Sequence, residues 1–220
     1  MGTDLSLIPM TLTIVIATAA VTIVAFRNEA IYRALMLDVD DVLHGGQFWR
    51  MLTSGLVHAD WMHLFANMVS LFAFGSWMEH VIEPWRFLML YVLGILIGSF
   101  TGVIKHRHDA SYRAVGASGG VCAVVGGATV LYPDLPMIIF PLPIPISSWI
   151  VGVLFIVYSI AGMRGRWDNV GHDAHLGGTL VGMGLIAAFY PALALQHWPY
   201  IAAIAVAGGI AYMWMQRRPS

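Results

Sequence analysis

The chain has 220 residues, of which 59% are hydrophobic and only 10% are charged. A soluble domain carries about 25% charged residues, so this chain has too few polar side chains to cover a surface that faces water. The formal net charge of −1 gives no indication of a nucleic-acid partner, and the single cysteine, Cys122, excludes an internal disulfide. Lipid is therefore the expected solvent, in agreement with a mean hydropathy of +0.76.

Seven apolar stretches are long enough to be membrane helices, because a bilayer core takes about 20 apolar residues per helix. They lie at about residues 7–26, 61–79, 86–104, 115–132, 146–163, 174–192 and 198–215. The first stretch lacks a basic leader and an A-x-A cleavage site, so we expect a retained helix and not a signal peptide. The sequence predicts an all-α, polytopic membrane bundle that forms one domain over residues 1–220. Its core is expected at about 7–192, with an added seventh span.

Two connections between the stretches stand out. Residues 27–60 form a long loop that carries many of the charged side chains. Residues 133–145 hold five prolines, which lack a backbone donor and argue against a continuous helix there. We expect the proline-rich segment to lie at the membrane interface.

Three polar clusters fall near the N-terminal ends of the second, fourth and sixth stretches. His63 and Asn67 have i,i+4 spacing and so share one helix face. The fourth stretch opens with GASGG at 116–120, and the sixth opens with HDAHLGG at 172–178. Alternate spans run in the same direction, so these three ends lie on one side of the membrane. Because polar groups in a span are costly and normally face the bundle interior, the clusters predict one shared site.

The types of side chain in these clusters favour acyl transfer. A serine hydroxyl such as that of Ser118 becomes a nucleophile when an imidazole, here His175, accepts its proton. Small residues let the two helices approach closely, and Gly119, Gly178 and Gly182 are placed to do so. The positive end of the fourth helix dipole would lie near Ser118, where an oxyanion would form.

Two further side chains could add donors to such an oxyanion hole, namely His63 and Asn67. Asp173 stands two residues from His175 and points to a different helix face, so a Ser–His dyad is favoured over a triad. Each feature alone has an ordinary structural explanation: small-residue packing, a satisfied core histidine, or an asparagine that links helices. Their coincidence at one end of three parallel helices favours a catalytic site.

In these motifs the sequence resembles the rhomboid family of intramembrane serine proteases, from about residue 45 to 192. The motifs are FWR at 48–50, H-x-x-x-N at 63–67, GASGG at 116–120 and A-H-L-G-G-x-x-x-G at 174–182. The resemblance implies a serine endopeptidase with no metal or organic cofactor. Its substrates would be single-span membrane proteins cut in or near their membrane segment, and its place would be a cell (plasma or inner) membrane.

The resemblance also implies roles for individual residues. Ser118 would be the nucleophile and His175 the base, with the oxyanion held by His63, Asn67 and the Ser118 N–H. The structural positions of the family would be occupied by Gly116, Gly119, Gly178, Gly182, Trp49 and Arg50, the last two with a folding role in the long loop.

The sequence departs from the family at two places. Many members have an aromatic residue one turn after the serine, where it packs on the catalytic imidazole, but here that position is Cys122. We expect a side chain from a neighbouring span to fill the space beside His175 instead, because an unfilled gap loses dispersion contacts. The stretch at 198–215 goes beyond the six spans of the family core.

The charge distribution and the family habit predict opposite orientations. One side of the bundle carries Arg86 alone, whereas the other side carries ten lysines and arginines, and the positive-inside rule would put that side, with the catalytic clusters, in the cytoplasm. Bacterial rhomboids commonly open to the outside. Some of these arginines could instead serve the structure of the long loop.

Three other functions stay open. A catalytically inactive relative that escorts membrane clients would have lost a dyad residue, and both are present here. A rhomboid specialised for C-terminal sorting tails is compatible with the sequence. A metal-dependent enzyme or transporter would draw on imidazole ligands, although H-E-x-x-H is absent and His172 is expected at the water interface. The candidate ligands are His58, His63, His106, His108, His172 and His175.

Overall fold

The computed structural model describes residues 9–138, 144–165 and 171–216. Its helices are α1 (Met10–Arg27), α2 (Glu29–Leu35), α3 (Val39–Leu43), α4 (Arg50–Thr53), η1 (Ser54–Leu56), α5 (Trp61–Ser70), η2 (Leu71–Gly75), α6 (Ser76–Ile82), α7 (Pro84–Lys105), α8 (Ser118–Leu131), α9 (Ser148–Gly165), α10 (His172–Phe189), α11 (Pro191–Gln196) and α12 (Trp198–Gln216). Four short strands complete it: β1 (Leu37–Asp38), β2 (Arg113–Ala114), β3 (Pro136–Ile138) and β4 (Pro145–Ser147). The predicted all-α bundle is confirmed.

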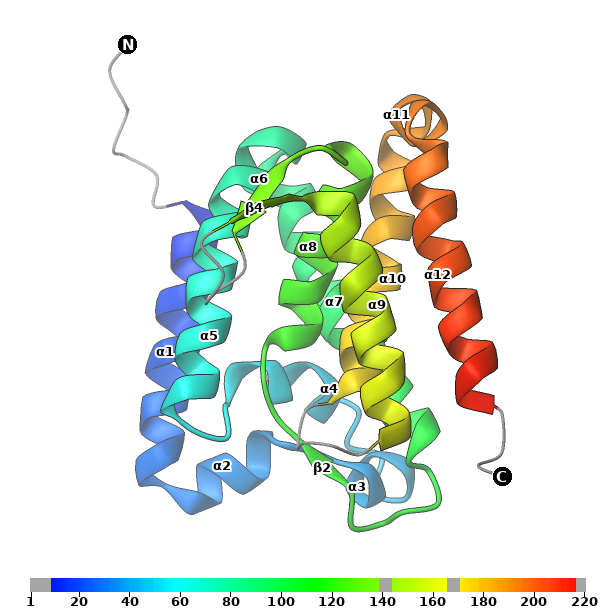
Figure 1. Cartoon of the computed structure of the whole chain (residues 1–220). Coiled ribbons are helices and arrows are strands. Elements are labelled where there is room, and N and C mark those ends of the chain that lie inside the picture. The colour runs from blue at the N-terminus through cyan, green and yellow to red at the C-terminus, as the bar shows by residue number, and fades with distance from the viewer. Residues whose placement is uncertain (1–8, 139–143, 166–170, 217–220) are drawn as a thin grey trace, which may run out of the picture.

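The long helices run up and down through the molecule, with α8 at the centre (Figure 1). Helix α10 packs most extensively against α8 and α7, and α12 packs mainly against α9. Helices α5, α8 and α10 all run upward in Figure 1, so the N-terminal end of each is its lower end, whereas α1 begins at the upper end of the molecule. The predicted sharing of one side by the three polar clusters is therefore confirmed.

Each predicted stretch contains a helix, but two segments differ from a simple continuous span. The second stretch passes through a π-helical turn, η2, before it continues as α6. In the proline-rich segment, β3 and β4 pair as an antiparallel hairpin with Met137 opposite Ile146, which agrees with the expected absence of a continuous helix. Residues 139–143 of that segment lie outside the described residues.

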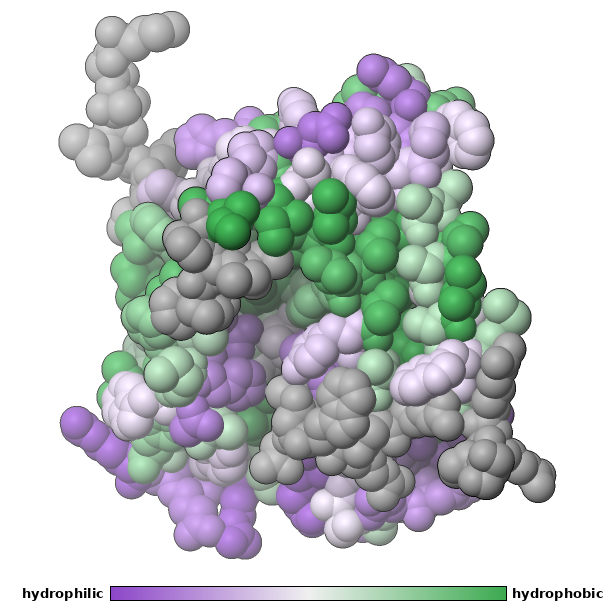
Figure 2. All heavy atoms as spheres, viewed as in Figure 1, coloured by the Kyte–Doolittle hydropathy of each residue, from purple (hydrophilic) through white to green (hydrophobic). Residues whose placement is uncertain are grey.

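Length and composition make α1, α7 and α12 candidate membrane spans among the described helices, while α8 and the apolar part of α9 (Ser148–Met163) are shorter. Figure 2 shows apolar side chains gathered around the middle of the molecule and hydrophilic ones at its two ends. This banding is what a bilayer requires, because apolar side chains face the hydrocarbon and polar ones face water.

The long loop is held together by two arginines. Arg50 is buried and donates from Nη1 to the carbonyls of Arg33 and Met36, at 2.7 and 2.8 Å, and its Nη2 pairs with Asp41 at 2.8 Å. Arg113 pairs with Asp38 at 2.8 Å. These contacts agree with the folding role predicted for Arg50. Because Arg50 and Arg113 both form ion pairs within the protein, they are weaker evidence for the orientation that the positive-inside rule predicts.

Trp49 differs from its neighbour Arg50. Its side chain is 57% exposed, so it does not pack in the loop interior as the predicted folding role suggests. Its backbone carbonyl accepts from the N–H groups of Leu52 and Thr53, both at 2.9 Å. An exposed tryptophan at the end of an apolar bundle suits the membrane–water interface, where its amphipathic ring is stable.

Glu79, at the start of α6, fixes the position of the first helix. Its carboxylate accepts from the backbone N–H groups of Met10 and Thr11, at 2.7 and 2.9 Å, and from the Thr11 hydroxyl at 2.8 Å. The first N–H groups of any helix lack intrahelical partners, and a carboxylate is the favoured charge at that end. Glu79 therefore ties α1 to α6 across 68 residues of sequence.

Candidate active site

Helix α8 begins at Ser118 and has 14 residues, so it is about 21 Å long at 1.5 Å per residue. A bilayer core is about 30 Å thick, so a helix of this length that ends near one surface begins below the other. The segment before Ser118 is an irregular loop whose backbone is pinned at Gly116, since the Gly116 N–H donates to the Ser54 carbonyl at 2.9 Å. By length alone, a helix α8 that ends near one membrane surface would place Ser118 below the other surface.

The next amide of this loop is held by a histidine. The Ala117 N–H donates to His58 Nε2 at 3.3 Å, and His58 Nδ1 lies 3.0 Å from the Thr22 hydroxyl, which donates to the Leu56 carbonyl at 2.9 Å. Because Nε2 accepts, Nδ1 carries the proton and donates to Thr22. His58 is 0% exposed, and this burial lowers its pKa to about 4, helped by the neighbouring His63. A neutral His58 thus positions the residue directly before the serine.

His63 lies against the same loop. Gly116 has a φ of +123°, and a Cβ at this glycine would lie 2.5 Å from His63 Cε1 and 2.7 Å from Nε2. A glycine is therefore required at 116 for both its backbone conformation and the close approach of the ring. The edge of His63 that could donate to an oxyanion is within reach of the loop that leads into Ser118.

Asn67 is one turn further along α5 and is buried. Its Nδ2 donates to the His63 carbonyl at 3.1 Å. An amide nitrogen carries two N–H donors, so one donor remains after this bond. The Asp60 side chain caps α5 by accepting from the His63 N–H at 2.8 Å, which fixes the helix turn that presents both residues.

Helices α8 and α10 touch through glycines, as the sequence predicts. A Cβ on Gly178 would collide with the Gly119 carbonyl oxygen and lie 2.9 Å from its carbon, and one on Gly182 would lie 2.6 Å from Ala123 Cα. Such backbone-to-backbone contact leaves no room for any side chain at these positions. Gly119 adjoins Ser118 in sequence, and Gly178 is one turn beyond His175.

Helix α7 touches both neighbours at the same level. A Cβ on Gly98 would lie 3.3 Å from Gly119 Cα and 2.7 Å from the Ala174 carbonyl oxygen. The residues that adjoin Ser118 and His175 therefore contact one and the same glycine. The hydrogen bond between Ser118 and His175 stays a prediction.

Asp173 faces α7 and not the imidazole of His175. Its Oδ2 lies 3.5 Å from His106 Nε2, and its carbonyl accepts from the Thr101 hydroxyl at 2.9 Å. The expected dyad without a carboxylate stays a prediction. His172 departs from expectation, because it is buried and not at the water interface; its ring lies edge-on to Tyr158, with centroids 5.0 Å apart.

The space beside His175 contains an aromatic ring that the sequence did not reveal. Phe155, from α9, stacks on His175 with ring centroids 5.7 Å apart and planes inclined by 26°. This contact agrees with the prediction that a side chain from a neighbouring span packs beside His175. Cys122 is buried and unpaired as a thiol on α8.

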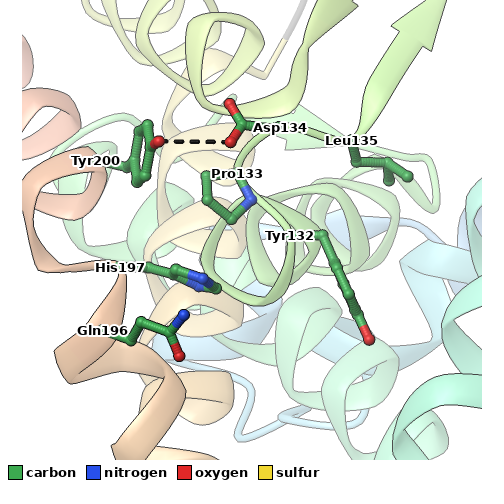
Figure 3. A pocket seen from close by; sticks show the side chains of 7 residues that line it. All are labelled: Tyr132, Pro133, Asp134, Leu135, Gln196, His197 and Tyr200. Carbon is green, nitrogen blue, oxygen red and sulfur yellow. Dashed lines mark hydrogen bonds between the residues drawn. The ribbon is translucent and has the colours of Figure 1, made fainter.

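No group of three or more metal-ligating side chains occurs within the described ranges. A cavity of about 590 Å³ lies at the far end of α8 from Ser118, between Tyr132 and Tyr200. Figure 3 shows its lining, with Tyr200 directed toward Asp134. It belongs to the seam between α8 and the last two helices and not to the site around the serine.

The fold and the site define a polytopic helical membrane protein in which the serine-bearing helix α8 contacts the histidine-bearing helix α10 through glycines. The chain belongs to the rhomboid family, since the model of the Rhomboid domain matches residues 45–192. This range agrees with the extent of the resemblance found in the sequence.

Three relatives illustrate the range of the similarity. Rhomboid protein 1, mitochondrial, of Saccharomyces cerevisiae is 27% identical over 149 residues, which cover 66% of this chain and 42% of the relative. RHOMBOID-like protein 12, mitochondrial, of Arabidopsis thaliana is 27% identical over 186 residues, 76% of this chain and 54% of the relative. The Bacillus subtilis protein named "Putative rhomboid protease YdcA" is 35% identical over 81 residues, 37% and 40% of the two chains. The chain spans about half the length of these curated relatives or less.

Proposed function

We propose that the protein is an intramembrane serine endopeptidase that uses Ser118 as nucleophile and His175 as general base. The observation that carries the proposal is the contact of α8 and α10 at Gly119, which adjoins Ser118, and Gly178, which is one turn beyond His175. Because the two helices touch at this point, the Ser118 hydroxyl and the His175 imidazole can lie at a similar level in the bundle. Family membership supports the same reaction.

In the proposed mechanism Ser118 Oγ attacks the carbonyl carbon of the scissile peptide bond, and His175 takes the hydroxyl proton. The tetrahedral oxyanion accepts from the Ser118 N–H, which lacks an intrahelical partner at the first position of α8, and from His63 and Asn67. The imidazolium then gives its proton to the leaving amine, which yields an acyl-enzyme. A water molecule, deprotonated by His175, hydrolyses this ester and restores the serine.

We propose single-span membrane proteins as substrates, cut in or near the membrane segment. The depth of Ser118 supports this assignment, because a soluble loop would have to enter the bilayer to reach it. A local unwinding of the substrate helix would expose the peptide bond, since helical backbone groups are already paired.

The protein is an integral membrane protein, and its residence in a cell (plasma or inner) membrane stays a proposal. Two of the three relatives described above carry mitochondrial in their names, so a mitochondrial membrane is the competing location. Fractionation of the native cells, with detection of the full chain by antibody, distinguishes the two.

Reconstitution with a defined substrate tests the proposed activity. The full chain is placed in liposomes with a single-span protein that carries a tag on each side of its membrane segment. We expect the wild type to release two fragments whose new termini, read by mass spectrometry, lie within or next to that segment. The Ser118→Ala variant, confirmed as folded by its circular dichroism, should release none. Equal cleavage by both forms would refute the assignment of the nucleophile.

A further inference from the structure

The stacked pair of Phe155 and His175 joins two helices that the sequence motifs do not connect. Phe155 is half-buried on α9, and its ring lies nearly parallel to the imidazole, at 26° and 5.7 Å between centroids. Stacked aromatic pairs with centroids at about 4.5–7 Å are attractive beyond the area that they bury. On α8, Cys122 stands one turn from Ser118 and offers no ring. The stacking partner of the imidazole is thus supplied by α9.

Helix α9 is held on its outer side by the seventh span, α12. Gly152 on α9 lies between two neighbours, since a Cβ there would be 3.1 Å from Ile204 Cδ1 and 3.2 Å from Thr129 Cγ2. Gly208 on α12 faces Ile156, with a Cβ placed 3.0 Å from Ile156 Cγ2. Ile204 is only 1% exposed although most of α12 faces outward. Helix α12 therefore contacts α9 on both sides of Phe155, at Gly152 one turn before it and at Ile156 directly after it.

The start of α12 is fixed to the core by polar and aromatic contacts (Figure 3). His197 Nδ1 lies 2.9 Å from the Val130 carbonyl at the end of α8, and the Tyr200 hydroxyl donates to Asp134 at 3.4 Å. The ring of Tyr200 also lies 5.8 Å from that of Trp149, near the beginning of α9. The seventh span is thus attached both to the helix that carries Ser118 and to the helix that carries Phe155.

We propose that Phe155 is a positioning residue for His175, and that α12 holds α9 in the register that keeps the two rings stacked. This inference rests on the proposed function for its catalytic consequence, although the stacking itself does not. The proposal gives α12, the seventh predicted span, an indirect role in the site around Ser118 and His175, through its contacts with α9. The imidazole has two rotatable side-chain bonds, and a flat ring against one face limits the rotation that would turn its nitrogen away from Ser118 Oγ.

Variants of Phe155 test the first half of the proposal. Phe155→Leu keeps an apolar side chain but removes the ring, and loss of one aromatic pair should lower kcat by about 2- to 12-fold. KM should stay unchanged, because the ring acts on the base and not on the substrate. Phe155→Tyr retains the ring and should restore kcat. Leu154→Ala on the outward face of α9, where the side chain is 53% exposed, is the matched control and should leave both constants unchanged.

Two isoleucines on α12 test the second half. Ile204→Ala removes the buried contact with Gly152, whereas Ile210→Ala makes the same chemical change at a side chain that is 59% exposed. We expect kcat to fall in the Ile204 variant by a factor similar to that of Phe155→Leu, and to stay at the wild-type value in the Ile210 variant. Combining Ile204→Ala with Phe155→Leu should add little, because both changes release the same ring contact.

Nuclear magnetic resonance of the full chain, labelled in its histidine rings, provides a readout that does not depend on catalysis. The aromatic ring current of Phe155 should shift the His175 ring protons, and this shift should disappear in Phe155→Leu, shrink in Ile204→Ala and persist in Phe155→Tyr. Unchanged His175 signals in Phe155→Leu would overturn the proposal. So would a fall in kcat that Phe155→Tyr does not restore. If the wild type and Ser118→Ala cleaved equally, the proposed function would fail while the spectra still tested the stacking.

Discussion

The close contact of α8 and α10 leads to a prediction that needs only one added methyl group. In Gly178→Ala the new Cβ would lie 2.9 Å from the Gly119 carbonyl carbon and 3.0 Å from its Cα. Carbon atoms reach their optimal separation at about 3.5–4.0 Å, so these two carbon contacts alone require the helices to separate by roughly 0.5–1 Å, and the closer Gly119 carbonyl oxygen requires more. Gly182→Ala meets Ala123 Cα at 2.6 Å and should act in the same direction. The larger Gly178→Leu and Gly182→Leu changes should be more severe.

The control lies on the same helix. A Cβ on Gly184 would meet no atom within 4 Å, so Gly184→Ala adds the same methyl group without a clash. In all three variants the intrinsic helix preference rises by about 1 kcal/mol, and any difference among them reports packing. Overpacking of an interior costs about 1–3 kcal/mol. We therefore expect Gly178→Ala to unfold at a lower temperature than the wild type and Gly184→Ala to unfold at the same or a higher temperature.

The effect on catalysis should exceed the effect on stability. A displacement of about 1 Å in a reacting pair can reduce the rate by about 100-fold, and Gly178 lies one turn from His175 while Gly119 adjoins Ser118. The assay is cleavage of the two-tagged substrate in liposomes, with thermal unfolding of the same preparations. Full turnover and wild-type stability in both Gly178→Leu and Gly182→Leu would refute the close-contact reasoning.

The other predictions concern single side chains of the site. Removing one oxyanion donor typically slows acyl transfer about 10²- to 10³-fold, so His63→Ala and Asn67→Ala should lower kcat in folded protein; normal kcat in both would make the pair structural. Burial lowers the pKa of His58 to about 4 in the folded protein. As the pH falls below about 6.5, His58 is therefore protonated in the unfolded chain before it is protonated in the folded one. The free energy of unfolding should drop by up to about 3 kcal/mol between pH 6.5 and pH 4. Unfolding titrations of His58→Gln should lack most of this drop, and an equal drop would contradict the assignment. Cys122→Ser should change activity little; an enzyme inactive in this form but active as Ser118→Ala would make the thiol the nucleophile.

Much of the fold follows from the sequence because lipid imposes a simple rule. Each span must be apolar and about 20 residues long, and the stretches predicted at 86–104 and 115–132 agree with α7 and α8 to within a few residues. The shared side of the polar clusters follows from the alternation of spans. Gly178 and Gly182 could be predicted as contact points because small residues permit close approach of helices.

Contacts between distant segments could not be predicted in this way. Phe155 lies in a span that carries none of the recognised motifs, so nothing in the sequence marks it as the partner of His175. His58 stands in a loop five residues before His63, and its bond to Ala117 crosses 59 residues. The burial of His172 depends on Tyr158 of α9 in the same way. Periodicity reports which face of a helix is buried, and it carries no information about which other helix covers that face.

The central claim, that His175 activates Ser118, is tested most directly by covalent labelling with a fluorophosphonate, which reacts with activated serine hydroxyls. The full chain in detergent is treated with the reagent, digested and analysed by mass spectrometry. We predict a single adduct on Ser118, absent from Ser118→Ala, that forms at least about 100-fold more slowly in His175→Ala, in line with the share of rate that a general base contributes. An adduct on another residue, or the same labelling rate in His175→Ala as in the wild type, would contradict the account.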